Sequence, residues 1–335
     1  LSGLLILGWD IGLRYFYPEA AVPPEVAAAA TATAKPQGAG DLGSEAAGAR
    51  KVDLKAALAS GTRVVIDTPR VAGSINLVGA RIDDIVLKDY RETVKKDSGP
   101  VRLFAPEGTA DQYFAEFGFV TGGVRQSSTA LWQADGAKLT PETPVTLTRT
   151  DAGGVTYRIR FAVDKNYMIT ATQSATNAGA AAAIIQPFAL IKRTDRNATI
   201  DQFVAHAGPV GVFGGTLWDP HSYDELAELG GEAPEGKASW LGFTDQYWLG
   251  ALVPGDGKGN VATDNAGFRS LGNTLFRADL LYRLDAVRLR VPPLRERRAD
   301  KGETKKVNKG STSMNSNKAN ALLLPFRLGM TPRPV

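Results

Sequence analysis

The chain has 335 residues, 43% of them hydrophobic, so it can bury one large core or two ordinary ones. It has no cysteine and two histidines, which excludes disulfides, cysteine-based metal sites and multi-histidine metal sites. Residues 271–335 hold 14 Lys or Arg against 5 Asp or Glu, whereas residues 1–270 hold 25 against 30. The basic excess therefore belongs to the C-terminal part, and nothing indicates that the body binds nucleic acid.

The first fifty residues divide into two segments of different composition. Residues 1–9 are almost all apolar, but about nine residues are fewer than the roughly twenty that cross a bilayer. We expect residues 1–18 to be the end of a truncated transmembrane helix, with a short core helix or a signal-peptide remnant as the alternative. Residues 19–50 are rich in Ala, Pro and Gly and predict a flexible linker.

Residues 51–268 are patterned for β-structure. In Val155–Val163 every second residue is apolar, which predicts a strand of an antiparallel sheet with one buried face. Residues 240–254 contain four aromatic residues and predict strands buried in the core near the end of this body. Only Tyr223–Leu229, preceded by Asp-Pro-His-Ser, has a helix pattern with a cap. The sequence therefore predicts an all-β fold, a large antiparallel sandwich with few short helices.

Two motifs of this body invite a functional interpretation. Asp83 and Asp84 form a carboxylate pair, but neighbours in a regular strand point to opposite faces, so we expect them to be solvated strand positions rather than an acid and base. Residues 113–119 (YFAEFGF) are aromatic, and they are either a core strand or a surface that binds extended apolar segments.

The two histidines lie near turn prolines and carboxylates. Asp219, Asp224 and Glu225 are within reach of His206 and His221 along the sequence. A histidine and a carboxylate are the groups that a sugar-ring-opening enzyme uses for proton transfer. Ordinary loop histidines are the competing interpretation, and nothing in the sequence fixes the geometry.

Residues 68–93 (TPRVAGSINLVGARIDDIVLKDYRET) closely resemble the start of the periplasmic domain in the YidC family of bacterial membrane protein insertases. The resemblance continues in order through residues 104–108, 112–119, 209–213 and 240–254. It covers about residues 1–268, and residues 1–18 are similar to the end of that family's first transmembrane helix.

This resemblance implies a β-supersandwich related to sugar-mutarotase folds, located in the periplasm on an inner-membrane protein. It implies a non-enzymatic role in inserting and folding inner-membrane proteins, with the Sec translocon and nascent membrane proteins as partners. No residue matches the family's C-terminal membrane helices, so we expect this chain to lack the insertase core. We assign no catalytic, cofactor-binding or metal-binding residue and no cofactor. A carbohydrate-binding or mutarotase-like module is the alternative.

The tail resembles a different family. Residues 275–300 are similar to a segment of the ATPase domain of NtrC-type activators, where Arg277 and Arg283 would match arginines that contact ATP across a subunit interface. A nucleotide-dependent activator is thus a third hypothesis, but the sequence has no phosphate-binding loop. We therefore predict that residues 269–335 are an unrelated basic tail, partly helical or disordered, and that the chain is a fragment or a chimera.

Overall fold

The structure is a computed structural model. It describes residue 42, residues 52–282 apart from gaps at 94, 96, 180–182, 196–205, 246, 255–265 and 273, and the backbone of residues 324–332. All of these residues belong to one compact unit, Leu42–Val335. The predictions for residues 1–18, and for the linker apart from Leu42, lie outside the described residues.

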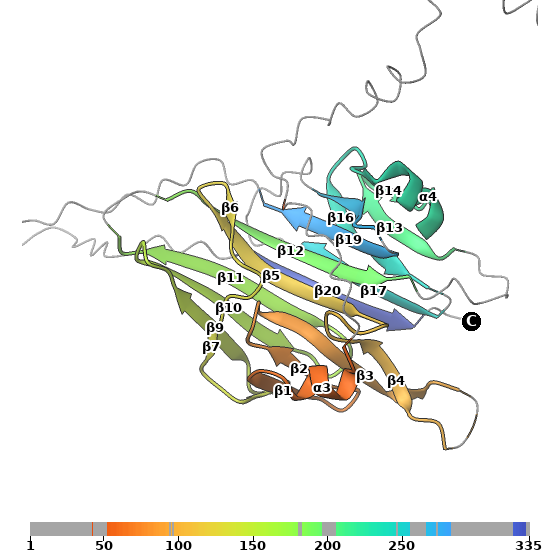
Figure 1. The fold of residues 1–335 in the computed structure, drawn as a ribbon, viewed down its shortest axis with the longest axis horizontal. Coiled ribbons are helices and arrows are strands. Elements are labelled where there is room, and N and C mark those ends of the chain that lie inside the picture. The colour runs from red at the N-terminus through yellow and green to blue at the C-terminus, as the bar shows by residue number, and fades with distance from the viewer. Residues whose placement is uncertain are drawn as a thin grey trace, which may run out of the picture. The chain divides into compact units, whose positions relative to one another are not determined.

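Strands dominate, and they form two sheets (Figure 1). The eleven-stranded sheet contains β1 (Arg63–Asp67), β2 (Val71–Asn76), β3 (Arg81–Arg91), β4 (Pro100–Phe104), β5 (Tyr113–Thr121), β6 (Val124–Arg125), β8 (Lys138–Leu139), β12 (Ile185–Thr194), β15 (Gly231–Glu232), β18 (Ala266–Ser270) and β19 (Leu275–Leu281). Its order is β15-β18-β19-β12-β5-β3-β2-β1-β8, with β4 beside β3 and β6 beside β5.

The second sheet has nine strands in the order β14-β13-β16-β17-β20-β11-β10-β9-β7. They are β7 (Gln133–Ala134), β9 (Val145–Thr150), β10 (Val155–Val163), β11 (Ile169–Asn177), β13 (Gly208–Phe213), β14 (Thr216–Trp218), β16 (Ala238–Thr244), β17 (Trp248–Pro254) and β20 (Leu324–Pro332). Among the pairings of both sheets, β1 with β8 is parallel and the rest are antiparallel. The predicted all-β, antiparallel fold class is confirmed.

The two sheets share one core. In β10 the predicted alternation is present, because Val155, Tyr157, Ile159, Phe161 and Val163 are all buried. The ring of Phe161 meets that of Phe117 on β5 edge to face, with centroids 5.6 Å apart. Residues of both sheets therefore belong to the same apolar cluster, as in a sandwich.

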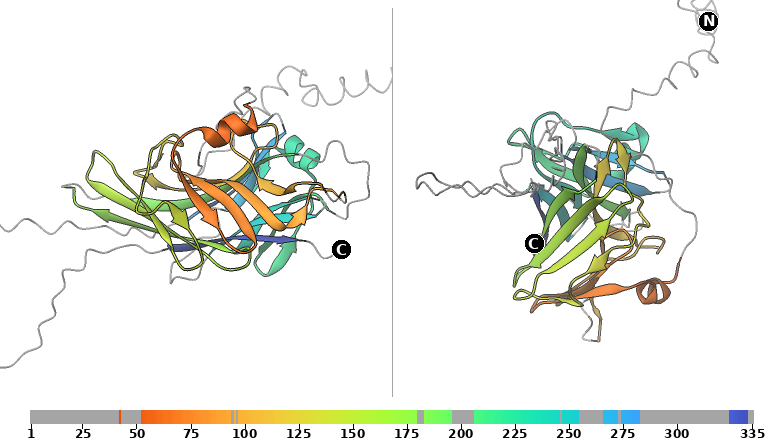
Figure 2. Two further views of the ribbon diagram at one scale, coloured as in Figure 1. Left: turned by 90° about the horizontal axis from the view of Figure 1, so that it is seen from below. Right: turned by 90° about the vertical axis from the view of Figure 1, so that its left-hand side faces the viewer.

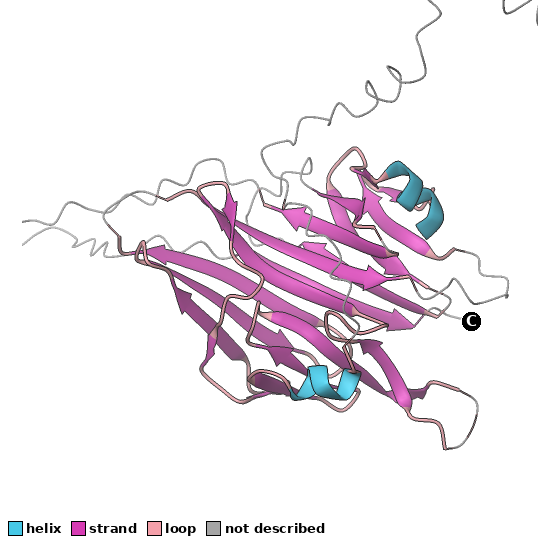
Figure 3. Cartoon of the chain, viewed as in Figure 1, coloured by secondary structure: helices cyan, strands magenta, loops and turns pink. Residues whose placement is uncertain are grey.

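Two short helices flank the strands in the part of the chain that the structure describes (Figures 2 and 3). They are α3 (Leu54–Ala59), near β1 and β3, and α4 (Tyr223–Leu229), near β13 and β14. α4 begins with a capping box in which Ser222 and Glu225 exchange hydrogen bonds, and it ends at Gly230 with φ of 73°. Neither helix of the described residues has the length and apolarity needed to cross a membrane.

The β body extends further than the sequence predicted. Its end was expected near residue 268, but β18 continues to Ser270, and β19 lies between β18 and β12 with all seven residues buried. Arg277 and Asp279 are the charged residues of this strand. They lie two positions apart on one face of β19 and pair with each other, so the strand can be buried despite its charges.

β20 is a second departure from the predicted tail. It pairs with β11 on one side and with β17 on the other. The sequence contained the signal, because residues 324, 326, 328 and 330 are apolar and alternate with other residues. The rest of the tail, residues 283–323 and 333–335, lies outside the described residues.

Candidate functional site

The outer face of the eleven-stranded sheet, turned away from the shared core, carries an unusual set of buried charges. Arg81, Glu116, Lys192, Arg277 and Asp279 are all between 0% and 7% exposed. Burying an ion costs several kcal/mol unless other groups pair with it. Such a cluster is therefore a natural first candidate for a functional site.

Strand alternation places these side chains on the outer face. On β5 the neighbours of Glu116, Ala115 and Phe117, belong to the shared core, so Glu116 points the other way. Lys192 on β12 stands in the same relation to the core residue Ile191. Arg81 on β3 lies directly opposite Glu116 in the strand pairing.

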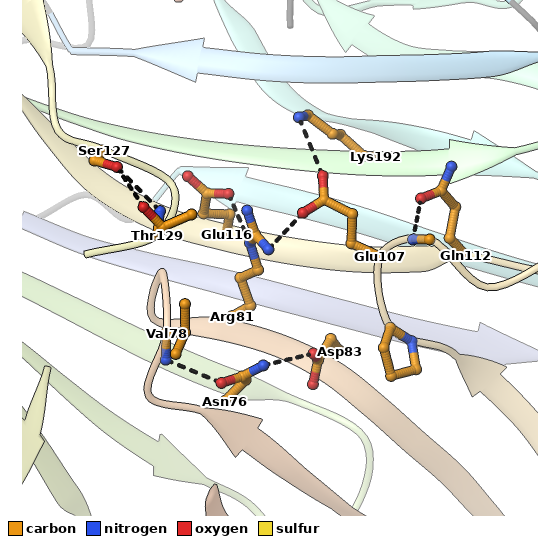
Figure 4. A network of polar contacts seen from close by, with 12 residues as sticks. Asn76, Val78, Arg81, Asp83, Glu107, Gln112, Glu116, Ser127, Thr129 and Lys192 are labelled. Carbon is orange, nitrogen blue, oxygen red and sulfur yellow. Dashed lines mark hydrogen bonds and ion pairs between the residues drawn. The ribbon is translucent and has the colours of Figure 1, made fainter. Parts of the chain in front are cut away.

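Arg81 is the centre of the network (Figure 4). Its Nε donates to Glu116 at 3.0 Å and its Nη1 donates to Glu107 at 2.6 Å. The other oxygen of Glu116 accepts from Arg125 on β6 at 2.6 Å, and Lys192 Nζ lies 3.9 Å from Glu107. Glu116 on β5 and Glu107 in the β4–β5 connection thus pair with three cations from three strands, β3, β6 and β12.

The network reaches solvent through Glu107, whose side chain is 44% exposed, in the connection between β4 and β5. A general acid or base must reach a substrate proton, but these contacts run between the protein's own groups. The arrangement is suited to fastening β3, β5, β6 and β12 together rather than to transferring protons.

Arg277 belongs to a second buried pair on the same outer face. Its Nε donates to Asp279 Oδ2 at 2.6 Å, and Arg269 Nε lies 3.6 Å from the same oxygen. Arg277, which the resemblance of the tail associated with ATP, therefore pairs with a carboxylate of the same strand inside the sheet. Arg283 lies outside the described residues.

Asp83 and Asp84 do not point to opposite faces, contrary to the expectation from alternation. The pairing of β2 with β3 shifts register at Ser74/Ile75, so Ile82 and Ile85 both face the core and the two aspartates lie between them. Arg63 Nη1 donates to Asp83 at 2.6 Å and to Ser74 Oγ at 3.0 Å. Ser74 in turn donates to Asp84 at 3.0 Å. A β-bulge thus joins the pair, through Arg63 and Ser74, into a partly buried network instead of leaving solvated positions.

The histidines form hydrogen bonds with groups other than those that the sequence suggested, although both interact electrostatically with Glu225. His221 Nε2 lies 2.6 Å from Oε2 of Glu232 on β15, and its ring centroid is 5.6 Å from that of Trp218. His206 Nε2 lies 3.1 Å from the carbonyl oxygen of Pro209. Glu225 instead accepts from the Ser222 backbone N–H at 2.7 Å, which lowers the pKa of its carboxyl group. Asp224 lies in the first turn of α4, and Asp219 precedes that helix.

The aromatic stripe of β5 is a core strand and not an open binding surface. Tyr113, Phe117 and Phe119 are at most 2% exposed and belong to the shared core. Phe114 lies on the outer face, beneath the guanidinium of Arg81 at 5.1 Å from the ring centroid. This supports the structural interpretation of residues 113–119.

Arg193 is a further buried cation that the sequence pattern did not reveal. Arg193 is 1% exposed and its guanidinium lies 4.9 Å from the ring centroid of Tyr113 and 5.3 Å from that of Tyr223. Burial raises the pKa of the Tyr223 phenol well above its usual value, and its hydroxyl donates to the carbonyl of Thr244. These contacts join β12, β5, α4 and β16. In the described part of the chain, no three His, Asp or Glu side chains gather as metal ligands.

Comparison with known proteins gives consistent relatives. Residues 63–290 match the family model of the YidC periplasmic domain. The membrane protein insertase YidC of Nitrobacter hamburgensis is 42% identical over 203 residues, covering 59% of this chain and 33% of that protein. Its counterpart in Bradyrhizobium diazoefficiens is 38% identical over 280 residues, covering 76% and 44%. The counterpart in Zymomonas mobilis is 34% identical over 283 residues, covering 83% and 47%. The chain thus spans a third to a half of the length of these relatives.

Solved structures with a similar course of the chain are more distant. A galactose mutarotase related enzyme from Lactobacillus acidophilus gives a TM-score of 0.45 at 10% identity, covering 81% of this chain and 97% of that one. A putative aldose 1-epimerase from Escherichia coli gives 0.41 at 10% identity, covering 81% and 99%. At this distance the resemblance says nothing about activity.

Proposed function

The chain belongs to the YidC periplasmic-domain family, and from this premise we propose that its β body is a non-enzymatic binding and scaffolding domain of a membrane protein insertase. The domain would lie in the periplasm at the inner membrane and aid the insertion and folding of inner-membrane proteins, with or without the Sec translocon. The observation that carries the proposal is the family match over residues 63–290, which takes in strands of both sheets from β1 to β19.

The buried charges support a binding role over a catalytic one. Arg81, Glu116 and Lys192 lie in contacts within the sheet, and Glu107 is their exposed member. A protein of this kind acts through its surface, so its partners are expected to touch exposed side chains rather than this network.

Such a surface lies in the eleven-stranded sheet where the β5–β6 turn meets the start of β12. Val124 on β6 is 72% exposed and Ile184, just before β12, is 54% exposed. The Gly122 N–H donates to the Ile184 carbonyl at 2.9 Å, so the β5–β6 turn and the start of β12 lie side by side. We name Val124 and Ile184 the apolar tip and propose it as a contact for emerging membrane-protein segments, which are themselves apolar.

Photo-cross-linking in membranes tests this proposal. A photoreactive amino acid at Val124 or Ile184 of the full chain, in inner-membrane vesicles carrying a stalled nascent membrane protein, should give adducts with the nascent chain or with Sec subunits. Arg158 on β10, also exposed, is the matched control and should give fewer adducts. If none of several exposed positions yields an adduct with either partner, the proposal fails.

A second candidate function rests on the pair of His221 and Glu232, 2.6 Å apart beside Trp218. A histidine, a carboxylate and an aromatic ring are groups that sugar-converting sites use, so a mutarotase-like activity has an observation in its favour. Polarimetry of freshly dissolved galactose distinguishes this activity from the proposed binding and scaffolding role. We expect the protein to leave the rate of mutarotation at that of buffer, whereas a faster rate abolished by His221→Ala would establish the second function.

A further inference from the structure

The nine-stranded sheet is continuous only because β20 lies in its middle (Figure 1). β17 pairs with residues 326–332 of β20, and β11 pairs with residues 324–328. Without β20 the sheet would divide into β14-β13-β16-β17 and β11-β10-β9-β7. The two strands that border β20 would then each present an edge of unpaired backbone groups.

β20 is engaged on both sides only over residues 326–328. Pro325 pairs only with β11 and Pro332 only with β17, so each proline lies where the strand has a single neighbour. Proline lacks the backbone N–H that a central position needs, which makes these single-sided positions the ones where it is tolerated. The part of β20 that pairs on both sides is therefore short, residues 326–328.

The connection to β20 is long. Residues 282–323 separate it from β19, several times the roughly 4–6 residues that commonly join elements of a compact domain. A connection of this length along the sequence does not by itself fix where β20 pairs. What holds β20 in place is thus its pairing with β11 and β17.

The walls of the gap are the facing edges of β11 and β17, which pair with β20 over residues 169–173 and 248–254. Because β20 is antiparallel to both neighbours, a segment running in that direction pairs antiparallel on both sides, which is slightly more stable per residue than parallel pairing. Main-chain hydrogen bonds give such strand addition its affinity, and the alternation of side chains gives it specificity.

We propose that the gap between β11 and β17, the acceptor gap, is a binding site for an extended polypeptide strand with alternating apolar residues. β20 occupies this site from within the chain, and a separate peptide of the same sequence can occupy it instead. The proposal concerns the nine-stranded sheet and does not depend on the insertase role.

The test uses the full chain and its Leu328→Pro variant, with a fluorescent peptide of residues 324–335 (LPFRLGMTPRPV) as the probe. Residue 328 pairs on both sides, so proline there should displace the internal strand and open the acceptor gap. We expect the variant to bind the peptide at least tenfold more tightly than the original chain, by fluorescence anisotropy. The same peptide carrying Leu328→Pro is the control and should bind at least tenfold more weakly.

Hydrogen exchange supplies an independent measurement that does not require peptide binding. In the Leu328→Pro chain, amides of residues 169–173 and 249–253 should exchange faster, and those of β5 and β12 should be unchanged. Adding the unmodified peptide should restore the protection. A folded variant whose β11 and β17 amides exchange as in the original chain would overturn the proposal, and so would fast exchange that the peptide never reverses. If the variant loses protection throughout, β20 is an integral strand and the proposal is wrong.

Discussion

The eleven-stranded sheet buries side chains on both faces, but those of the outer face include charged groups. The inner face packs apolar side chains such as Ile82, Phe117 and Ile191 against the second sheet. The outer face buries Arg81, Glu116 and Lys192, which pair across strands. Removing apolar atoms from a packed face lowers the free energy of unfolding roughly in proportion to the volume removed. Removing one partner of a buried ion pair costs more, because the other charge is left buried without its counter-charge.

This difference teaches that burial alone does not identify a functional site. Buried charges that pair across strands can fasten a sheet, just as a core aromatic does. Four substitutions test whether the two faces are stabilised in different ways.

The largest effect is expected on the inner face, from Phe161→Ala. Its ring lies against Phe117 of the other sheet, so truncation leaves a cavity between the sheets. The free energy of unfolding should fall by about 3–5 kcal/mol, measured by urea titration. A loss below about 1 kcal/mol would mean that the two sheets are not packed through this contact.

On the outer face, Glu116→Gln should cost about 3 kcal/mol, because Arg81 and Arg125 would remain buried without the charge that they share. Glu142→Gln, at an exposed position, is the matched control and should change stability by less than about 0.5 kcal/mol. Equal effects of the two substitutions in urea titrations would show that the outer face is not held by charge pairing.

Glu107→Gln removes the second carboxylate bound to Arg81, but this side chain is 44% exposed. Water screens and replaces such a contact, so the expected loss is only about 1 kcal/mol. The ratio between the effects at Glu116 and Glu107 therefore measures how strongly burial amplifies the same kind of ion pair. A loss at Glu107 as large as that at Glu116 would contradict the account.

The smallest effect is expected at Asp67, where hydrogen bonds from Lys138 and Lys88 lower the pKa of the carboxyl group to about 2. A lowered carboxyl pKa stabilises the folded state above the ordinary value of about 4, and this contribution is lost as the pH falls toward 2. The stability difference between the original chain and Asp67→Asn should shrink over that range and also in 1 M salt. Urea midpoints that differ equally at pH 2 and pH 6 would refute it.

Much of the fold could be predicted because it is encoded locally. The alternation in Val155–Val163 and the Ser222 cap of α4 are signals within one element, and both structures are present. The periodicity of residues 324–330 was equally local, but it was not recognised at the end of a basic tail. That error was one of interpretation and not a limit of the sequence.

The outer-face network could not be predicted, because its partners are far apart along the chain. Arg81 and Glu116 are 35 residues apart, and the strand pairing that joins them is visible only in the folded sheet. The β-bulge at Asp83 and Asp84 is a further example, since alternation alone places neighbouring side chains on opposite faces. The exposure of a charged side chain in a strand therefore cannot be predicted until the residue that carries its counter-charge is known.

The most direct test of the central claim, that the outer face is a structural charge network, is a double-mutant cycle at Arg81 and Glu116. Urea unfolding of Arg81→Met, Glu116→Gln and the double variant gives the coupling energy between the two side chains. We predict a coupling energy of about 2 kcal/mol or more. The double variant should then be nearly as stable as the less stable of the two single variants. Strictly additive losses would contradict the claim and would reopen these charges as a site for a partner.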